Sequence, residues 1–145
     1  MAADLDPLIR LRKHVVEEKQ RVVSQLYREV ENLEKQKKVV QDQMAHEKKL
    51  AEEMQRPEAL TFYGRYAEGA RKKIEAIQMS IRKVEARIES AQEDMRIAFA
   101  EMKKVQITQT RREKREQKKL KDKEDALLDE VALDQYRRKV LEDEN

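Results

Sequence analysis

Apolar side chains recur at a coiled-coil spacing through residues 60–105. Fourteen consecutive positions, separated alternately by three and four residues, are all apolar or aromatic. A mean spacing of about 3.5 residues aligns them in one narrow stripe along an α-helix, and a second helix can cover such a stripe. The pattern predicts a coiled coil. The positions are Leu60, Tyr63, Ala67, Ala70, Ile74, Ile77, Ile81, Val84, Ile88, Ala91, Met95, Ala98, Met102 and Val105.

A second stripe runs through the first third of the chain. Its spacing averages about 3.6 residues, so we expect this helix to be nearly straight at first and to tighten into heptads later. Lys19 and Lys37 interrupt the stripe, and we expect their stems to lie along the seam while the ammonium groups reach water. The stripe comprises Leu8, Leu11, Val15, Lys19, Val22, Leu26, Val30, Leu33, Lys37, Val40, Met44, Ala51 and Met54.

Pro57 separates the two stripes. Proline breaks a helix interior but suits a first turn, so the sequence predicts a lead at 1–7, a helix over 8–54, a turn at 55–57 and a helix over 58–105. Helices of similar length on either side of a short turn can cover each other's stripes. We therefore expect an all-α fold, a long antiparallel two-helix coiled coil. The alternative is one long helix, kinked at Pro57, that pairs with a second chain.

The remaining residues, 106–145, lack the apolar stripe but contain good helix formers and no Pro or Gly. They predict a charged helical extension. Residues 111–123 hold eight basic and three acidic side chains, whereas residues 124–145 hold three basic and eight acidic ones. An apolar cluster lies among these acids, and the hairpin cannot cover it, so we interpret it as a docking tail. The cluster is Leu127, Leu128, Val131 and Leu133.

Aromatic residues gather just after the expected turn. Tyr63 belongs to the stripe, whereas Phe62 and Tyr66 fall on positions that should face water. Exposed aromatics on a polar helix suggest a contact surface. They can instead fold over the end of the hairpin as a plug, and the sequence does not choose between these interpretations. Gly64 and Gly69 weaken the helix here by about 1 kcal/mol each relative to Ala.

The sequence offers no motif for catalysis. The two glycines lie inside a helical pattern without the Lys-Ser/Thr pair of a phosphate-binding loop. His14 and His46 are far apart in the chain, and there is no cysteine, so no metal-ligand spacing is present. We expect a non-enzymatic protein with no cofactor, no metal and no small-molecule substrate. No apolar run approaches the length of a membrane span, so we also expect a cytoplasmic protein.

The chain resembles the FliJ family of flagellar type III export proteins in four features. The chain opens with Pro7-Leu8-Ile9-Arg10-Leu11-Arg12, and its middle reads Tyr63-x-x-Tyr66-x-x-x-Ala70-x-x-x-Ile74. The other two features are the basic helix over 111–123 and the ending Leu127-Leu128-Asp129-Glu130. Together they extend over nearly the whole chain.

The resemblance implies a cytoplasmic antiparallel coiled coil similar to the central stalk of rotary ATPases. Such a protein binds the hexameric export ATPase FliI and the export gate protein FlhA, and it escorts the chaperones of late substrates; association with the membrane is peripheral, through these partners. Residues 62–74 fall in the region that resembles the gate-binding surface, with contacts expected from Phe62, Tyr63, Tyr66, Ala70 and Ile74. For the ATPase ring we expect contacts from Arg111, Arg112, Lys114, Arg115, Lys118 and Lys119.

Two other classes of function compete with this one. A generic homodimeric scaffold would have the same composition. The basic block at 111–115 could also bind nucleic acid through phosphates. Against nucleic acid, no aromatic residue interleaves the block and acidic residues follow at once.

Overall fold

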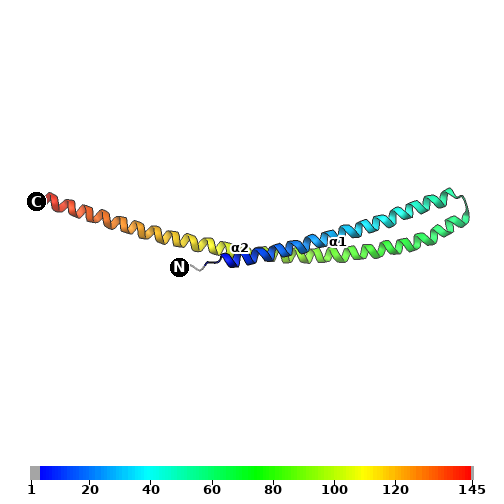
Figure 1. Ribbon diagram of the computed structural model, residues 1–145, viewed down its shortest axis with the longest axis horizontal. Coiled ribbons are helices and arrows are strands. Elements are labelled where there is room, and N and C mark those ends of the chain that lie inside the picture. Colours follow the sequence, from blue (N-terminus) through cyan, green and yellow to red (C-terminus); the bar gives the residue numbers. More distant parts are fainter. Residues whose placement is uncertain (1–3, 145) are drawn as a thin grey trace. The chain divides into compact units, whose positions relative to one another are not determined.

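The computed structural model describes residues 4–144, and throughout this range the protein is built from two α-helices. Helix α1 spans Asp6–Glu53 and helix α2 spans Pro57–Glu144, with no strand among the described residues (Figure 1). The expected all-α fold with a helical hairpin is confirmed. Of the predicted lead at 1–7, residues 1–3 lie outside the described residues.

The helix ends follow from local backbone chemistry. Asp4 Oδ1 accepts a hydrogen bond of 3.0 Å from the N–H of Asp6, and Pro7 occupies the first turn of α1, where a missing N–H costs nothing. Helix α1 ends at a short turn in which Gln55 adopts a φ of 53°. This left-handed conformation is the usual way to stop a helix, although glycine adopts it at lower cost. Pro57 then opens α2.

Two compact units divide the described chain: residues 14–99 form one, and residues 4–13 with 100–144 form the other. In residues 14–99 the two helices lie side by side and run in opposite directions from the turn (Figure 1). Their seam is centred on a cluster of five buried side chains, with Val30, Leu33 and Met95 packed against it. The cluster comprises Val23, Leu26, Val84, Ile88 and Ala91.

The seam of α1 differs from its predicted register. Val16 and Val23 are buried, whereas Val22, which we placed on the stripe, is 45% exposed. The half-buried or buried positions of α1 therefore follow a heptad spacing from Val16 onwards, without the predicted straight start. The cause is a pair of Val-Val doublets in the sequence. Either member of a doublet could face the partner helix, and the phase set by Leu26 selects the second member in each.

The seam of α2 agrees with prediction except at its first position. From Tyr63 to Ala98 every residue of the predicted stripe is buried or half-buried, and Ile81 is completely buried. Leu60 is 54% exposed, which corrects our expectation, and Ala59 is half-buried in its place. The chain enters α2 directly from the turn, and the residue that faces α1 there is one position earlier. Met54, predicted to lie on the α1 stripe, is likewise 64% exposed.

Polar contacts cross the seam of residues 14–99 at three levels. The Lys37 ammonium donates a hydrogen bond of 2.9 Å to Gln78 Oε1, so this half-buried lysine finds a protein acceptor where we expected water. The Gln92 side chain donates to the Tyr27 hydroxyl at 2.7 Å. Arg87 lies 3.9 Å from Glu29 at the surface. Such contacts favour one register of the two helices.

In the second unit, residues 4–13 pack against the start of the 100–144 segment. The backbone N–H of Leu5 donates to Gln109 Oε1 at 3.2 Å, and Met102 is buried. Leu11, predicted on the seam, is 56% exposed, and the neighbouring Arg12 is half-buried with an Nε that has no hydrogen-bond partner among the described residues. The same one-residue change of register as at Val22 explains this correction.

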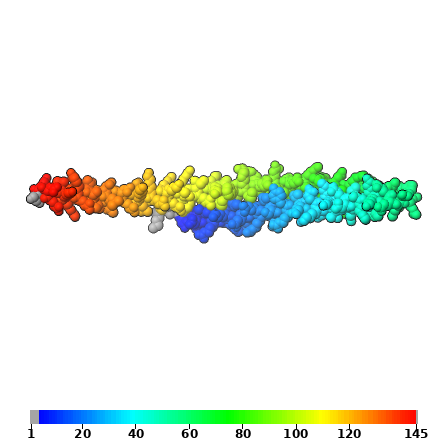
Figure 2. All heavy atoms as spheres, turned by 90° about the horizontal axis from the view of Figure 1, so that it is seen from above, coloured from blue at the N-terminus to red at the C-terminus, as the bar shows by residue number. Residues whose placement is uncertain are grey.

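Beyond Arg112 the α2 helix has no covering segment within its unit. Every residue from 113 to 144 is exposed. In the space-filling view the N-terminal segment of the same unit does not extend along the orange and red part of the helix (Figure 2), which agrees with the ribbon view. The charged helical extension is therefore a single exposed helix.

Candidate protein-binding surfaces

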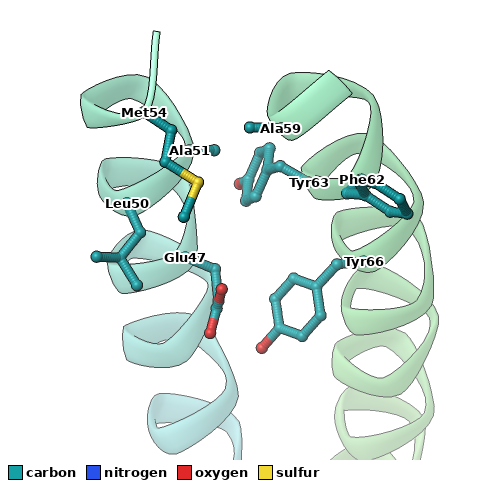
Figure 3. A pocket seen from close by; sticks show the side chains of 8 residues that line it. All are labelled: Glu47, Leu50, Ala51, Met54, Ala59, Phe62, Tyr63 and Tyr66. Carbon is teal, nitrogen blue, oxygen red and sulfur yellow. The ribbon is translucent and has the colours of Figure 1, made fainter. Parts of the chain in front are cut away.

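The first candidate surface lies beside the turn, where the two helices leave a shallow hollow of about 340 Å³. In Figure 3, Tyr63 and Tyr66 project from α2 into the gap toward α1, whereas Phe62 points to the outer side of α2. Helix α1 contributes one acidic and two apolar side chains, and the turn contributes Met54. The lining residues are Glu47, Leu50, Ala51, Met54, Ala59, Phe62, Tyr63 and Tyr66.

Large apolar side chains remain accessible on this surface. Phe62 is 69% exposed, Met54 is 64% exposed, and Tyr66 and Leu50 are about two-fifths exposed. Since Phe62 points away from the gap, it does not close the end of the hairpin as a plug. A grouped set of exposed aromatic and aliphatic residues is typical of a protein-binding surface.

A second hollow, of about 370 Å³, begins on the other side of Tyr66. It is lined by Arg65, Gly69, Ala70 and Lys73 from α2 and by residues of α1 that include Val40. Tyr66 lines both hollows, so the two form one continuous candidate surface along residues 40–73. We call this the tip surface.

The fold of the chain does not require glycine at either of the two glycine positions of α2. A Cβ added at Gly64 or Gly69 would meet no atom within 4 Å, and neither residue has a positive φ. Each nevertheless weakens the helix by about 1 kcal/mol relative to alanine. Since glycine lowers the stability of the helix at these two positions and the fold does not require it, we infer that the glycines serve contacts with another molecule.

The predicted gate-binding residues divide into two groups. Phe62 and Tyr66 are exposed, whereas Ala70 is buried and Tyr63 and Ile74 are half-buried in the seam. Helix α2 brings all five to the same region of residues 14–99. Sequence analysis missed Met54 as a surface residue, because its exposure depends on how the chain leaves α1 at the turn. It also missed Leu50, although the predicted stripe already left Leu50 off the seam.

The second candidate surface is the basic part of the extension, in the other unit. Of the six predicted ring-binding residues, five are exposed and Arg112 is half-buried. Arg111 and Lys114 also line a shallow hollow of about 300 Å³ with Lys103, Gln106 and Ile107. Glu113 accepts a hydrogen bond of 3.1 Å from the Gln109 side chain. This surface therefore presents basic side chains on a helix that is already formed.

The docking-tail residues are exposed on the same helix. Their exposed fractions run from 47% at Val131 to 65% at Leu128. The structure adds Leu120, Tyr136, Val140 and Leu141 to the apolar side chains that nothing within the unit covers. These residues do not form one stripe: Leu133 and Tyr136 lie on the side of the helix opposite to Leu127 and Val131, because each residue turns about 100°.

No described residue combines the features of a catalytic or metal site. Residues 4–144 contain no group of three His, Asp or Glu side chains that could hold a metal ion. At the surface, a hydrogen bond from Arg96, with Nη2 2.6 Å from the Glu93 carboxylate, lowers the pKa of Glu93. His14 Nε2 lies 3.1 Å from Glu18 Oε1, and both side chains are exposed to solvent. Within the described residues no helix is apolar over a length that would cross a bilayer.

A protein-family model described as "Flagellar FliJ protein" matches residues 1–141 of the 145-residue chain. The chain belongs to the FliJ family. It is therefore a component of the flagellar protein export system, as the sequence motifs indicated. No curated protein and no solved structure matches the chain. Within this FliJ chain, both candidate surfaces lie inside the matched range.

Proposed function

We propose that this FliJ chain is a non-enzymatic, cytoplasmic coiled-coil component of the flagellar export apparatus that joins two partners. The tip surface binds the export gate protein FlhA. The basic segment 111–119 binds the hexameric export ATPase FliI, in a role similar to the central stalk of a rotary ATPase. The chain also escorts export chaperones, and it associates with the membrane peripherally, through these protein contacts. It acts on no small molecule.

The observation that carries the proposal is that every residue of the α2 extension from 113 to 144 is exposed. A helix that packs against nothing in its own chain is marginal in water and gains stability from a partner. Its basic part is adjacent to half-buried residues such as Gln109 and Arg112, so it is presented on a folded support. The absence of acid–base or metal motifs in the sequence agrees with a binding function.

The tip surface supports a second contact of a different chemical kind. It offers Phe62, Tyr66, Leu50 and Met54, and aromatic residues in such clusters commonly dominate binding energy. Gly69 allows a partner to approach the α2 backbone closely beside Tyr66. An apolar surface at one place and a charged surface at another suit two different partners.

The ring contact is tested by neutralising four exposed basic residues together and measuring the stimulation of FliI ATPase activity. The variant carries Arg111→Gln, Arg115→Gln, Lys118→Gln and Lys119→Gln. We expect stimulation to fall and its dependence on salt concentration to weaken, because charge contacts at a surface are screened by salt. A matched control neutralises four exposed lysines of the other unit, Lys35, Lys38, Lys72 and Lys83. Unchanged stimulation with unchanged salt dependence in the first variant contradicts the ring contact.

The gate contact is tested with the double variant Phe62→Ala and Tyr66→Ala in a binding assay with FlhA. We expect binding to weaken at least about tenfold, since each truncation removes an exposed aromatic anchor. Met79→Ala is the control, because Met79 is a 59% exposed apolar residue of the same helix outside the tip surface. Equal binding by the double variant and the control rejects the proposed gate contact.

A further inference from the structure

The chain supplies only small apolar side chains to the seam beside the turn. Glu47 falls on the heptad spacing of the α1 seam, four residues before the buried Ala51, but its side chain is exposed. On α2 the buried residues nearest the turn are Ala67 and Ala70. Ala51 lines the first hollow of the tip surface and Ala70 lines the second. The two hollows therefore form a groove whose floor is made of methyl groups.

We propose that this groove takes one amphipathic α-helix of the gate protein, with its apolar residues near the turn and an acidic residue at the far end. The inference rests on the proposed gate contact, and it adds the form and the charge of the bound segment. The groove runs along α2 from Phe62 to Lys73, about 16 Å, which accommodates about three turns of a ligand helix.

The first argument concerns backbone hydrogen bonds. Both walls of the groove are α-helices, so their backbone N–H and C=O groups are paired within each helix. An extended segment adds to the edge of a sheet because free backbone groups are available there, and the two described helices offer few such groups. A helix satisfies its own backbone and needs only side-chain contacts. The walls therefore favour a helical ligand over an extended one.

The second argument is the close approach that Gly69 permits. A Cβ added at Gly69 would meet no atom within 4 Å, so the space above the α2 backbone is open at the second hollow. Tyr66 projects into the gap beside it (Figure 3) and lines both hollows. Leu50 and Phe62 are exposed at the end of the groove nearer the turn. The apolar residues of the ligand helix therefore belong at that end.

The third argument is charge. Arg65 and Lys73 line the second hollow, which has no acidic lining residue, whereas Glu47 is the charged residue that lines the first hollow. All three side chains are exposed, and none forms an ion pair among the described residues. A carboxylate of the ligand is attracted to the second hollow and repelled from the first. This difference selects an acidic segment and determines which of its ends lies near the turn.

Filling the groove tests this mode of binding without removing a contact. We expect Gly69→Leu to weaken binding of intact FlhA at least about tenfold, because the new side chain occupies the path of the ligand helix. The position is open, so the fold tolerates the substitution, and circular dichroism verifies this. Ala76→Leu is the control: it lies seven residues further along the same helix face and lines neither hollow. The control should bind FlhA like the unaltered chain.

Reversing one charge tests the acidic end of the ligand. We expect Lys73→Glu to weaken FlhA binding roughly tenfold at low ionic strength, and the difference to shrink as salt is added. The matched control is Arg71→Glu. Arg71 is exposed and lines neither hollow, and it lies about 200° round the helix from Lys73. This control should change the affinity by less than about twofold.

Overlapping peptides of FlhA, mixed with the full chain, identify the bound segment. We expect the peptide that binds to have apolar residues at helical spacing and an acidic residue, and to gain helix content by circular dichroism on binding. Replacing its acidic residue by lysine should weaken binding to the unaltered chain and restore binding to the Lys73→Glu variant. The exchange of charges on both sides therefore tests the pairing directly.

The results separate this inference from the proposed gate contact. If Phe62→Ala with Tyr66→Ala weakens FlhA binding but Gly69→Leu and Lys73→Glu do not, the tip surface binds the gate and the groove proposal is wrong. The groove proposal is also wrong if the bound peptide is basic or stays extended, or if no peptide binds. If the double alanine variant binds FlhA normally, the gate contact itself is wrong.

Discussion

Residues 14–99 and residues 113–144 are both rich in charged helix formers, but only in the first region does a second helix cover the apolar side chains. In residues 14–99 the α2 stripe includes the completely buried Ile81, whereas in residues 113–144 every side chain is exposed. Composition therefore does not distinguish a structural helix from a binding helix. The distinction lies in whether the same chain supplies a partner helix, since packing provides most of the stability of a helix in water.

Amide hydrogen exchange should show the largest difference between the two regions. We expect seam amides of residues 14–99 to exchange at least about a hundredfold more slowly than amides of residues 113–144. An uncovered helix opens by local fraying, whereas the paired helices must separate first. Similar protection in both regions of a monomer would show that the extension is covered by its own chain.

Truncation of one apolar side chain in each region tests the same comparison by stability. We expect Ile81→Ala to lower the free energy of unfolding by about 2–4 kcal/mol, because it removes a fully buried side chain and leaves a cavity. Leu127→Ala, at a 61% exposed position, should change it by less than about 0.5 kcal/mol. Urea unfolding of the dilute chain measures both values. Comparable losses would contradict the contrast between the regions.

Substitution of the two glycines tests how helix propensity contributes to stability within residues 14–99. We expect Gly64→Ala and Gly69→Ala each to raise the free energy of unfolding by about 1 kcal/mol, because the added Cβ meets no neighbour and alanine favours helix. The exposed Ala76→Gly substitution on the same helix provides the inverse control and should lower stability by a similar amount. Weaker FlhA binding by the stabilised Gly69→Ala variant would connect this residue to the tip surface.

The smallest effect concerns the surface pair of Glu93 and Arg96. The hydrogen bond from Arg96 lowers the pKa of Glu93, so this carboxylate contributes stability above its ordinary pKa, and the contribution is lost as pH falls through the lowered value. We expect Glu93→Gln to be slightly less stable than the unaltered chain at neutral pH and indistinguishable from it in strong acid. Thermal unfolding of both chains across this pH range measures the difference. A difference in stability between the two chains that grows as the pH falls would contradict this explanation.

The sequence predicted the α2 seam well because its apolar positions keep the alternating spacing of three and four residues without a break from Leu60 to Val105. It predicted the α1 seam less well. Where two valines are adjacent, as at Val22 and Val23, spacing alone allows either to face inward, and only the partner helix decides. The exposed charged extension followed directly from the loss of the stripe after Val105.

The candidate site was predicted in part. Phe62 and Tyr66 were recognisable because they are aromatic at positions that face away from the seam. Met54 was not, because its exposure depends on how the backbone turns at Gln55. Leu50 was recognisable in the same way as Phe62, since the predicted stripe leaves it off the seam.

The size of the seam side chains varies along the paired region, and this determines where the hairpin opens most easily. Close to the turn the buried residues are Ala51, Ala67 and Ala70, whereas the cluster further away includes Leu26 and Ile88. A methyl group removes much less surface from water than a branched side chain, so separating the helices locally requires the least work beside the loop. A simple hairpin frays at its free ends. Here we expect the two helices to separate first beside the turn, so a partner protein can part them there while the rest of the coiled coil stays folded.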